Sequence, residues 1–184
     1  QVFVTTLQAI SGAGYPGVPS LDILANVIPY IGGGEEEKIQ TETLKILGTL
    51  DADGVAPAPM TVSAQVTRVP VENGHTVCLA IGFDRRVDPD EAIAAIESWP
   101  GEIAALDLPS APRPPVVVTR DIDRPQPRRD AGAGHGMQVV VGRVRRDPIL
   151  DLRLVALGHN TIRGAAGASV LNAELLVARG LVGS

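Results

Sequence analysis

Arg68 and His75 are the two residues of this chain whose types and spacing first suggest chemistry. Residues 60–66 alternate apolar and polar positions as a half-buried strand does, and Arg68 continues the positions of Val62 and Val66, which predicts a buried guanidinium. A buried arginine requires an anion, which is either a structural carboxylate or the carboxylate of a ligand held by two hydrogen bonds.

The dipeptide Asn73-Gly74 is typical of a hairpin turn, and a second strand is expected at 75–83. In such a hairpin Arg68 lies opposite Leu79, and Arg68 and His75 share one face. Pro70 argues for an edge or a bulge instead. Without further context, a histidine after a turn is more often solvated surface than a general base.

The other reactive side chains carry weaker signals. His135 lies in a glycine-rich loop, and His159 precedes Asn160 at a strand end, where a structural role is favoured. Cys78 stands between Val77 and Leu79, a setting for a buried, inert thiol. No spacing of His, Cys, Asp and Glu resembles a zinc site, so we expect no metal.

Residues 12–17 fit the dinucleotide-binding pattern G-x-G-x-x-G and follow a predicted strand at 1–11. That pattern binds a pyrophosphate only when its last glycine opens a long helix. Pro16, Pro19 and Pro29 interrupt the segment, so we interpret it as a tight loop with positive φ angles, or as a loop packed close to a ligand.

The remaining elements predict an α+β domain with a mostly antiparallel or mixed sheet and helices on one face. A helix is expected at 35–47, with acids in its first turn that suit the helix dipole. Asp88-Pro89 begins another helix that ends near Trp99. Three more strands are expected at 116–119, 137–144 and 149–157, and the longest helix at 161–178.

Composition excludes several classes of protein. Hydrophobic residues make up 45% of the 184 positions, which excludes a disordered chain, and a net charge of −5 argues against a nucleic-acid partner. No apolar run reaches the roughly 18–20 residues of a membrane span. The single cysteine suggests a reducing, cytoplasmic compartment.

Several long motifs stand out in the chain: QAISGAGYPG at 8–17, NVIPYIGG at 26–33, ETLKILG at 42–48, RVPV at 68–71 with GHT at 74–76, and HNTIRGAAGA at 159–168. Together they resemble aspartate-semialdehyde dehydrogenases of the archaeal and fungal branch. The resemblance implies the substrate-binding and dimerisation domain found in enzymes like glyceraldehyde-3-phosphate dehydrogenase, over residues 1–184. It also implies NADPH-dependent reduction of β-aspartyl phosphate to aspartate semialdehyde, through a cysteine thioester, in a homo-oligomer.

The same resemblance assigns roles by position. His75 is similar to the acid/base and Gln8 to the residue that orients the substrate. Arg68 resembles the clamp on the α-carboxylate, Glu42 the carboxylate facing the α-ammonium group, and Lys45 the phosphate ligand. Asn160 resembles a contact to NADP near the nicotinamide, with Ser11 and Gly12 close by.

The family's Rossmann domain and its Asn-Cys motif with the nucleophile do not occur in this sequence, and Cys78 does not match that motif. The chain opens inside a strand, which favours a cut within a longer protein, and residues 161–180 are expected to pack on the nucleotide-binding domain. Two other hypotheses for the function remain. The chain could belong to a related acyl-CoA reductase, in which Glu42 has no amino group to bind, or it could be an oligomerisation or ligand-binding module without catalysis.

Overall fold

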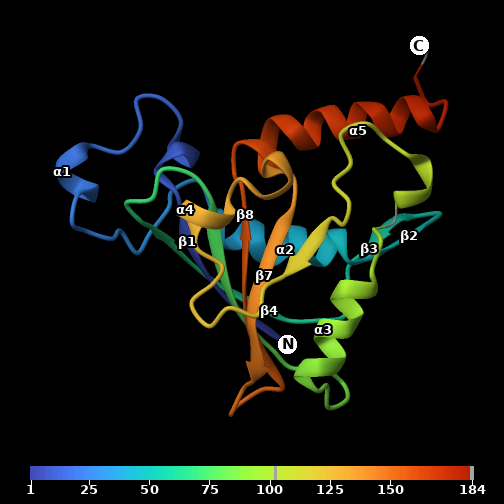
Figure 1. Ribbon diagram of the computed structural model, residues 1–184, viewed down its shortest axis with the longest axis horizontal. Coiled ribbons are helices and arrows are strands. Elements are labelled where there is room, and N and C mark those ends of the chain that lie inside the picture. The colour runs from blue at the N-terminus through green and yellow to red at the C-terminus, as the bar shows by residue number, and fades with distance from the viewer. Residues whose placement is uncertain (102, 183–184) are drawn as a thin grey trace.

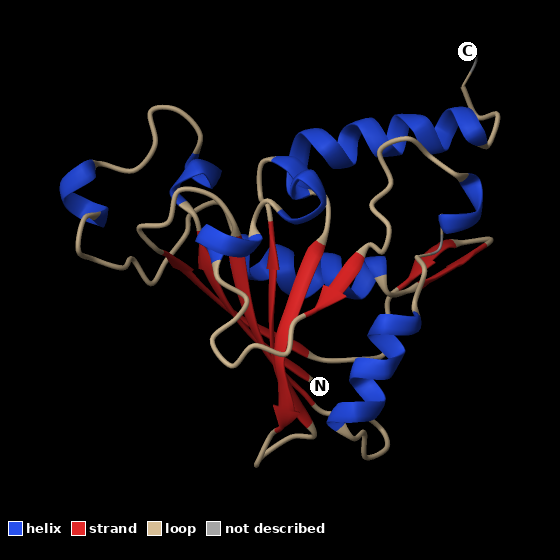
Figure 2. Ribbon diagram, in the orientation of Figure 1, coloured by secondary structure: helices blue, strands red, loops and turns tan. Residues whose placement is uncertain are grey.

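A six-stranded mixed sheet forms the centre of the molecule (Figure 2). The computed structural model describes residues 1–101 and 103–182. The strands of the large sheet lie in the order β4-β1-β5-β8-β7-β6. They are β1 (Val2–Gln8), β4 (Val62–Arg68), β5 (His75–Ile81), β6 (Val116–Val118), β7 (Val139–Arg146) and β8 (Leu152–Gly158). A separate small ribbon pairs β2 (Thr49–Asp51) with β3 (Gly54–Ala56).

The helices surround this sheet (Figure 1). They are α1 (Ser20–Ile23), α2 (Glu35–Ile46), α3 (Pro89–Ser98), α4 (Pro127–Asp130) and α5 (Gly167–Ala178), with a π-helical turn at Ile162–Ala166 leading into α5 and 3-10 turns at Ile10–Ala13, Ala104–Leu106 and Ala133–Gly136. The predicted α+β class and mixed sheet are confirmed. None of these helices is long and apolar enough to span a membrane.

The alternation of β1 and β4 divides the sheet into two faces. Val4, Thr6 and Gln8 of β1 are buried, as are Val66 and Arg68 of β4. We call this the α2 face, because α2 packs along β4 on the far side of the sheet in Figure 1. On the opposite, open face, Phe3 and Leu7 of β1 are exposed. For β4, the sequence therefore predicted the buried face correctly from period two alone.

The predicted hairpin between 62–68 and 75–83 is wrong, because β1 lies between the two strands. β1 runs parallel to β4, with Gln8 opposite Arg68, and antiparallel to β5, with Leu7 opposite Thr76. Residues 69–72 cross the end of β1 and bond to it: Val69 N–H donates to the Gln8 carbonyl at 3.0 Å, and Ile10 N–H donates to the Val71 carbonyl at 2.8 Å. The segment after Arg68 is thus a crossover rather than a two-residue turn.

A loop held by a buried ion pair covers part of the open face. Asp130 is 4% exposed and accepts hydrogen bonds from the guanidinium of Arg124 and from Gln126 N–H. Burial alone would raise the pKa of Asp130, but these hydrogen bonds and the Arg124 charge outweigh it and lower that pKa. The loop also packs on the turn before His75, because a Cβ at Gly74 would lie 3.1 Å from the Ala131 Cβ.

We expect Asp130→Ala to destabilise the chain by about 2–3 kcal/mol, because it leaves a charged group and a backbone N–H without their acceptor. Urea unfolding measures this loss. The matched control is Asp121→Ala, since Asp121 lies 3.5 Å from the same guanidinium but is 65% exposed. It should cost no more than about 0.5 kcal/mol. Equal losses in the two variants would contradict this account of the loop.

Candidate active site

Gln8, Arg68 and His75 meet where three adjacent strands end. Gln8 and Arg68 are cross-strand neighbours, and the pairing of Leu7 with Thr76 places His75 beside Gln8 on the other side. All three side chains project from the α2 face, because Gln8 and Arg68 share the parity of the buried positions in β1 and β4, and the register places His75 opposite Gln8. The prediction that Arg68 and His75 lie on one face is confirmed by this register, although the predicted pairing of Arg68 with Leu79 is wrong.

The peptide groups of Ala9 connect Arg68 and His75. Ala9 is fully buried; its N–H donates to His75 Nδ1 at 3.1 Å, and its carbonyl accepts from Arg68 Nη1 at 2.6 Å. Gly12, in the turn that follows, closes over both side chains. A methyl group at Gly12 would lie 3.1 Å from Arg68 Nη1 and 3.2 Å from His75 Nε2, so a side chain at this position would displace one of them by a few tenths of an ångström.

Glu35 brings a carboxylate to this group from the N-terminal residue of α2. Its Oε1 accepts a hydrogen bond from Gln8 Nε2 at 3.3 Å, and its charge acts on both Arg68 and His75. The next residue fixes the helix end, because Glu36 Oε1 accepts from the N–H of Val66 in edge strand β4 at 3.0 Å. Sequence reasoning missed Glu35: the three consecutive acids at 35–37 suited the helix dipole, and nothing in the pattern showed that this helix end faces the strand ends.

Glu42 and Lys45, which were predicted to bind substrate, do not join the group. Both are exposed, seven and ten residues beyond Glu35 in α2. At about 1.5 Å per residue they lie roughly 10 and 15 Å further along the helix axis. Helical periodicity places Glu35 and Glu42 on similar faces, and it does not show which turn reaches the site.

His75 is held in its neutral form. The pKa of His75 is lowered to about 4, chiefly by burial and also by the positive charge of Arg68, while the charge of Glu35 acts in the opposite direction. Burial also lowers the pKa of Arg68, but an arginine keeps its proton at neutral pH. The site therefore combines a cation, a neutral imidazole and an amide, with a carboxylate nearby. This set suits a small ligand that carries both a carboxylate and an amino group.

Asn160 joins the two loops that flank His75. Its Oδ1 accepts from Gly74 N–H at 2.8 Å and its Nδ2 donates to Ser11 Oγ at 2.8 Å. The structure thus brings together the three residues predicted to lie near the cofactor, Asn160, Ser11 and Gly12. Asn160 keeps one N–H and one lone pair free of these two bonds.

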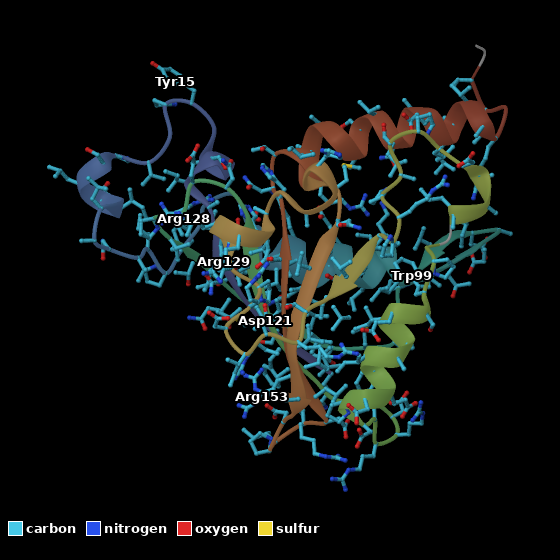
Figure 3. The ribbon with its side chains drawn as sticks, viewed as in Figure 1. Tyr15, Trp99, Asp121, Arg128, Arg129 and Arg153 are labelled. Atoms are coloured by element: carbon cyan, nitrogen blue, oxygen red, sulfur yellow. The ribbon has the colours of Figure 1, made fainter. Side chains whose placement is uncertain are left out.

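Apart from Gly12, the remaining sequence signals lie away from the site. The G-x-G-x-x-G segment is a loop with Gly14 and Gly17 at φ 67° and 88°, and α1, which follows it, has four residues. Tyr15 projects from this loop into solvent (Figure 3). Cys78 is paired with Thr5 and so points to the open face, opposite to His75, and burial raises the pKa of its thiol. These positions favour the loop interpretation and an inert thiol.

Comparison with known proteins identifies relatives along the whole chain. The family model for the semialdehyde dehydrogenase dimerisation domain matches residues 1–163. An aspartate-semialdehyde dehydrogenase of Archaeoglobus fulgidus is 52% identical over 96% of this chain and 50% of its own length. The corresponding protein of Saccharomyces cerevisiae is 48% identical over 97% of this chain and 51% of its own length.

Solved structures agree. The aspartate semialdehyde dehydrogenase of Candida albicans, with NADP, superimposes with a TM-score of 0.88 at 44% identity, over 98% of this chain and 51% of that one. A Vibrio cholerae enzyme complexed with ASA gives 0.74 at 28% identity, over 96% of this chain and 54% of that one. The chain spans about half the length of the relatives that it matches.

The lowered pKa of His75 predicts a specific pH dependence of stability. Below about pH 6.5 the unfolded state binds a proton at this histidine, whereas the folded state does so only near pH 4. The free energy of unfolding therefore falls as the pH drops through this window. In the His75→Asn variant, the asparagine oxygen takes the place of Nδ1 as the acceptor for the Ala9 N–H, and the asparagine side chain does not titrate. The free energy of unfolding of this variant should therefore fall less over the same pH window.

Urea unfolding at pH 7, 6, 5 and 4.5 measures the free energy of unfolding of wild type and of His75→Asn. The contributions of carboxylates that titrate in both proteins cancel when the two free energies are subtracted. A difference between wild type and His75→Asn that stays constant from pH 7 to 4.5 would contradict the lowered pKa.

Proposed function

This chain belongs to the semialdehyde dehydrogenase dimerisation-domain family, and we propose that it is the substrate-binding half of an NADP-dependent aspartate-semialdehyde dehydrogenase. The observation that carries the proposal is the convergence of Arg68, His75, Gln8 and Glu35 at the ends of three strands. The names of the relatives support the activity, and the site has the groups that a four-carbon amino acid needs.

The proposed reaction is the reduction of β-aspartyl phosphate to aspartate semialdehyde through a cysteine thioester. Arg68 binds the α-carboxylate through its planar fork, and Glu35 faces the α-ammonium group in place of Glu42. Lys38, one helical turn after Glu35, replaces Lys45 as the phosphate ligand. Gln8 orients the substrate from between Arg68 and His75, and His75 acts on the oxygen or sulfur of the reacting centre.

The nicotinamide fits beside Asn160, Ser11 and Gly12. The free N–H and lone pair of Asn160 match a carboxamide, and Ser11 Oγ keeps its own proton for donation. NADPH supplies the hydride when it is bound. The rest of the dinucleotide site and the cysteine nucleophile belong to a Rossmann domain, which we propose as the partner against which α5 packs.

A matched pair of variants tests the substrate clamp. In the full-length enzyme, Glu35→Gln should lower kcat/KM at least roughly tenfold, mainly through KM, because a charged hydrogen bond to the ammonium group contributes about 1.5–3 kcal/mol. Glu42→Gln makes the same chemical change two turns further along α2 and should stay within about twofold of wild type. A larger loss of kcat/KM in Glu42→Gln than in Glu35→Gln would show that Glu42, and not Glu35, binds the ammonium group. An unchanged KM in both variants would favour a substrate without an amino group, such as an acyl-CoA.

The 184-residue chain alone should show no dehydrogenase activity. His75 moves no electrons, and Cys78 lies on the opposite face of the sheet with its pKa raised by burial. The assay mixes the chain with aspartate semialdehyde, phosphate and NADP⁺ and follows absorbance from NADPH. Turnover that is abolished by Cys78→Ser would show that the nucleophile lies in this chain.

We propose that the open face of the sheet contacts a second copy, in keeping with the dimerisation-domain family. Phe3 is 54% exposed there. Phe3→Glu should raise the dimer dissociation constant at least roughly tenfold, because it places a charge in an apolar interface. Phe83, which is 46% exposed and follows β5, provides the control Phe83→Glu. A wild-type chain that sediments as a monomer at high micromolar concentration would contradict the proposal, as would equal effects of the two substitutions.

A further inference from the structure

Glu36 joins the start of α2 to the edge of the sheet. β4 is an edge strand, so the N–H groups on its outer side have no neighbouring strand to pair with. Val66 is fully buried, and its N–H therefore needs an acceptor from elsewhere in the chain. Glu36 Oε1 provides that acceptor at 3.0 Å, from 30 residues earlier in the sequence.

Local contacts leave the start of α2 weakly fixed. Three consecutive glycines at 32–34 precede the helix, and Gly33 and Gly34 have positive φ angles. Gly34 is the N-cap residue, and it makes no side-chain hydrogen bond to the helix. The position of this helix end therefore depends on its bonds to the sheet. The 3.0 Å bond of Glu36 is shorter than the 3.3 Å bond that Glu35 accepts.

The same short stretch of β4 carries Arg68. Val66 and Arg68 are two positions apart, and the Arg68 N–H donates to the Ile28 carbonyl at 2.8 Å, so the edge of the strand is bonded at both positions. Glu35 and Glu36 are adjacent in α2. The separation of the Glu35 carboxylate from the Arg68 guanidinium is therefore set through one residue of helix, one hydrogen bond and two residues of strand.

We infer that Glu36 is a positioning residue that sets the separation of Glu35 from Arg68, and through it the selectivity for an α-amino acid. The inference rests on the proposed function, in which Glu35 binds the ammonium group and Arg68 the carboxylate. An α-amino acid carries both groups on one carbon, so the two side chains must be held at a matching separation. A misplacement of about 1 Å can cost roughly a hundredfold in activity. Glu36 acts through Glu35, because its own carboxylate is bonded at the edge of the sheet.

Variants of the full-length enzyme, assayed with aspartate semialdehyde, phosphate and NADP⁺, test this role. Glu36→Ala removes the acceptor and should raise the KM for aspartate semialdehyde roughly tenfold, the size expected when the Glu35 contact is lost. The KM for NADP⁺ should stay within about twofold of wild type, because Asn160 follows β8 on the far side of β5. Glu36→Gln keeps an acceptor oxygen for the Val66 N–H and should restore a KM within about threefold of wild type.

Combination with Glu35→Gln separates positioning from a general loss of stability. If Glu36 acts through Glu35, Glu36→Ala has little left to disturb once the Glu35 charge is gone. It should then change the KM for aspartate semialdehyde by less than about twofold in the Glu35→Gln background. The same fold increase in both backgrounds would overturn the inference, as would a wild-type KM in Glu36→Ala alone.

Glu37→Ala is the matched control, because Glu37 is exposed in the same helical turn and its substitution removes an equal charge from the helix N-terminus. It should leave the KM within about twofold of wild type. A KM as high as that of Glu36→Ala would show that the helix dipole is responsible, and would contradict the role of the bond to Val66.

Thermal unfolding checks that each variant is folded. If Glu36→Ala does not fold, Glu36→Asp takes its place: it keeps the charge but is one carbon shorter, so it should also raise the KM, and a wild-type KM would contradict the inference. A wild-type enzyme without turnover on aspartate semialdehyde would overturn the proposed function and the inference with it. An active wild-type enzyme whose KM is insensitive to Glu36 would overturn the inference alone.

Discussion

The arrangement of the site depends on one buried residue, Ala9, through its backbone N–H and its backbone C=O. Each of these groups is bonded to a different functional side chain, His75 and Arg68, and neither can reach water because Ala9 is fully buried. An unpaired buried peptide group costs about 1–3 kcal/mol, so the two side chains and the loop hold one another in place. The position of β1 between β4 and β5 brings both backbone groups of Ala9 to their partners.

The charges of the site follow from the same geometry. Arg68 is buried against a carbonyl rather than a carboxylate of the chain, so its charge remains available to an incoming anion. Burial, together with the charge of Arg68, keeps the neighbouring imidazole neutral. Glu35 approaches from α2, where Gln8 donates to it, and it gives the site a negative end opposite the guanidinium. The Arg68 guanidinium and the Glu35 carboxylate therefore complement the carboxylate and the ammonium group of an amino acid.

Much of this could be predicted from the sequence, and the failures have a common physical cause. Period two in 62–68 showed that Arg68 is buried, and the motif around His75 was recognisable. The hairpin failed because β1, more than 50 residues earlier in the chain, inserts between strands that are neighbours in sequence. Periodicity also could not choose between Glu35 and Glu42, since both lie on one side of α2 and only tertiary packing decides which turn reaches the strand ends. The bond between Asn160 and Ser11 joins residues 149 positions apart, and the pairing of their side chains left no local signal.

Amide hydrogen exchange at Ala9 tests most directly whether the buried backbone of this residue organises the site. In the wild-type chain its N–H should exchange as slowly as the amides in the middle of β1, because it is buried and bonded to His75. His75→Ala should speed that exchange by at least roughly tenfold, and His75→Asn, which keeps an acceptor, should preserve most of the protection. Fast exchange at Ala9 in wild type, or an equal rate in wild type and His75→Ala, would contradict the account.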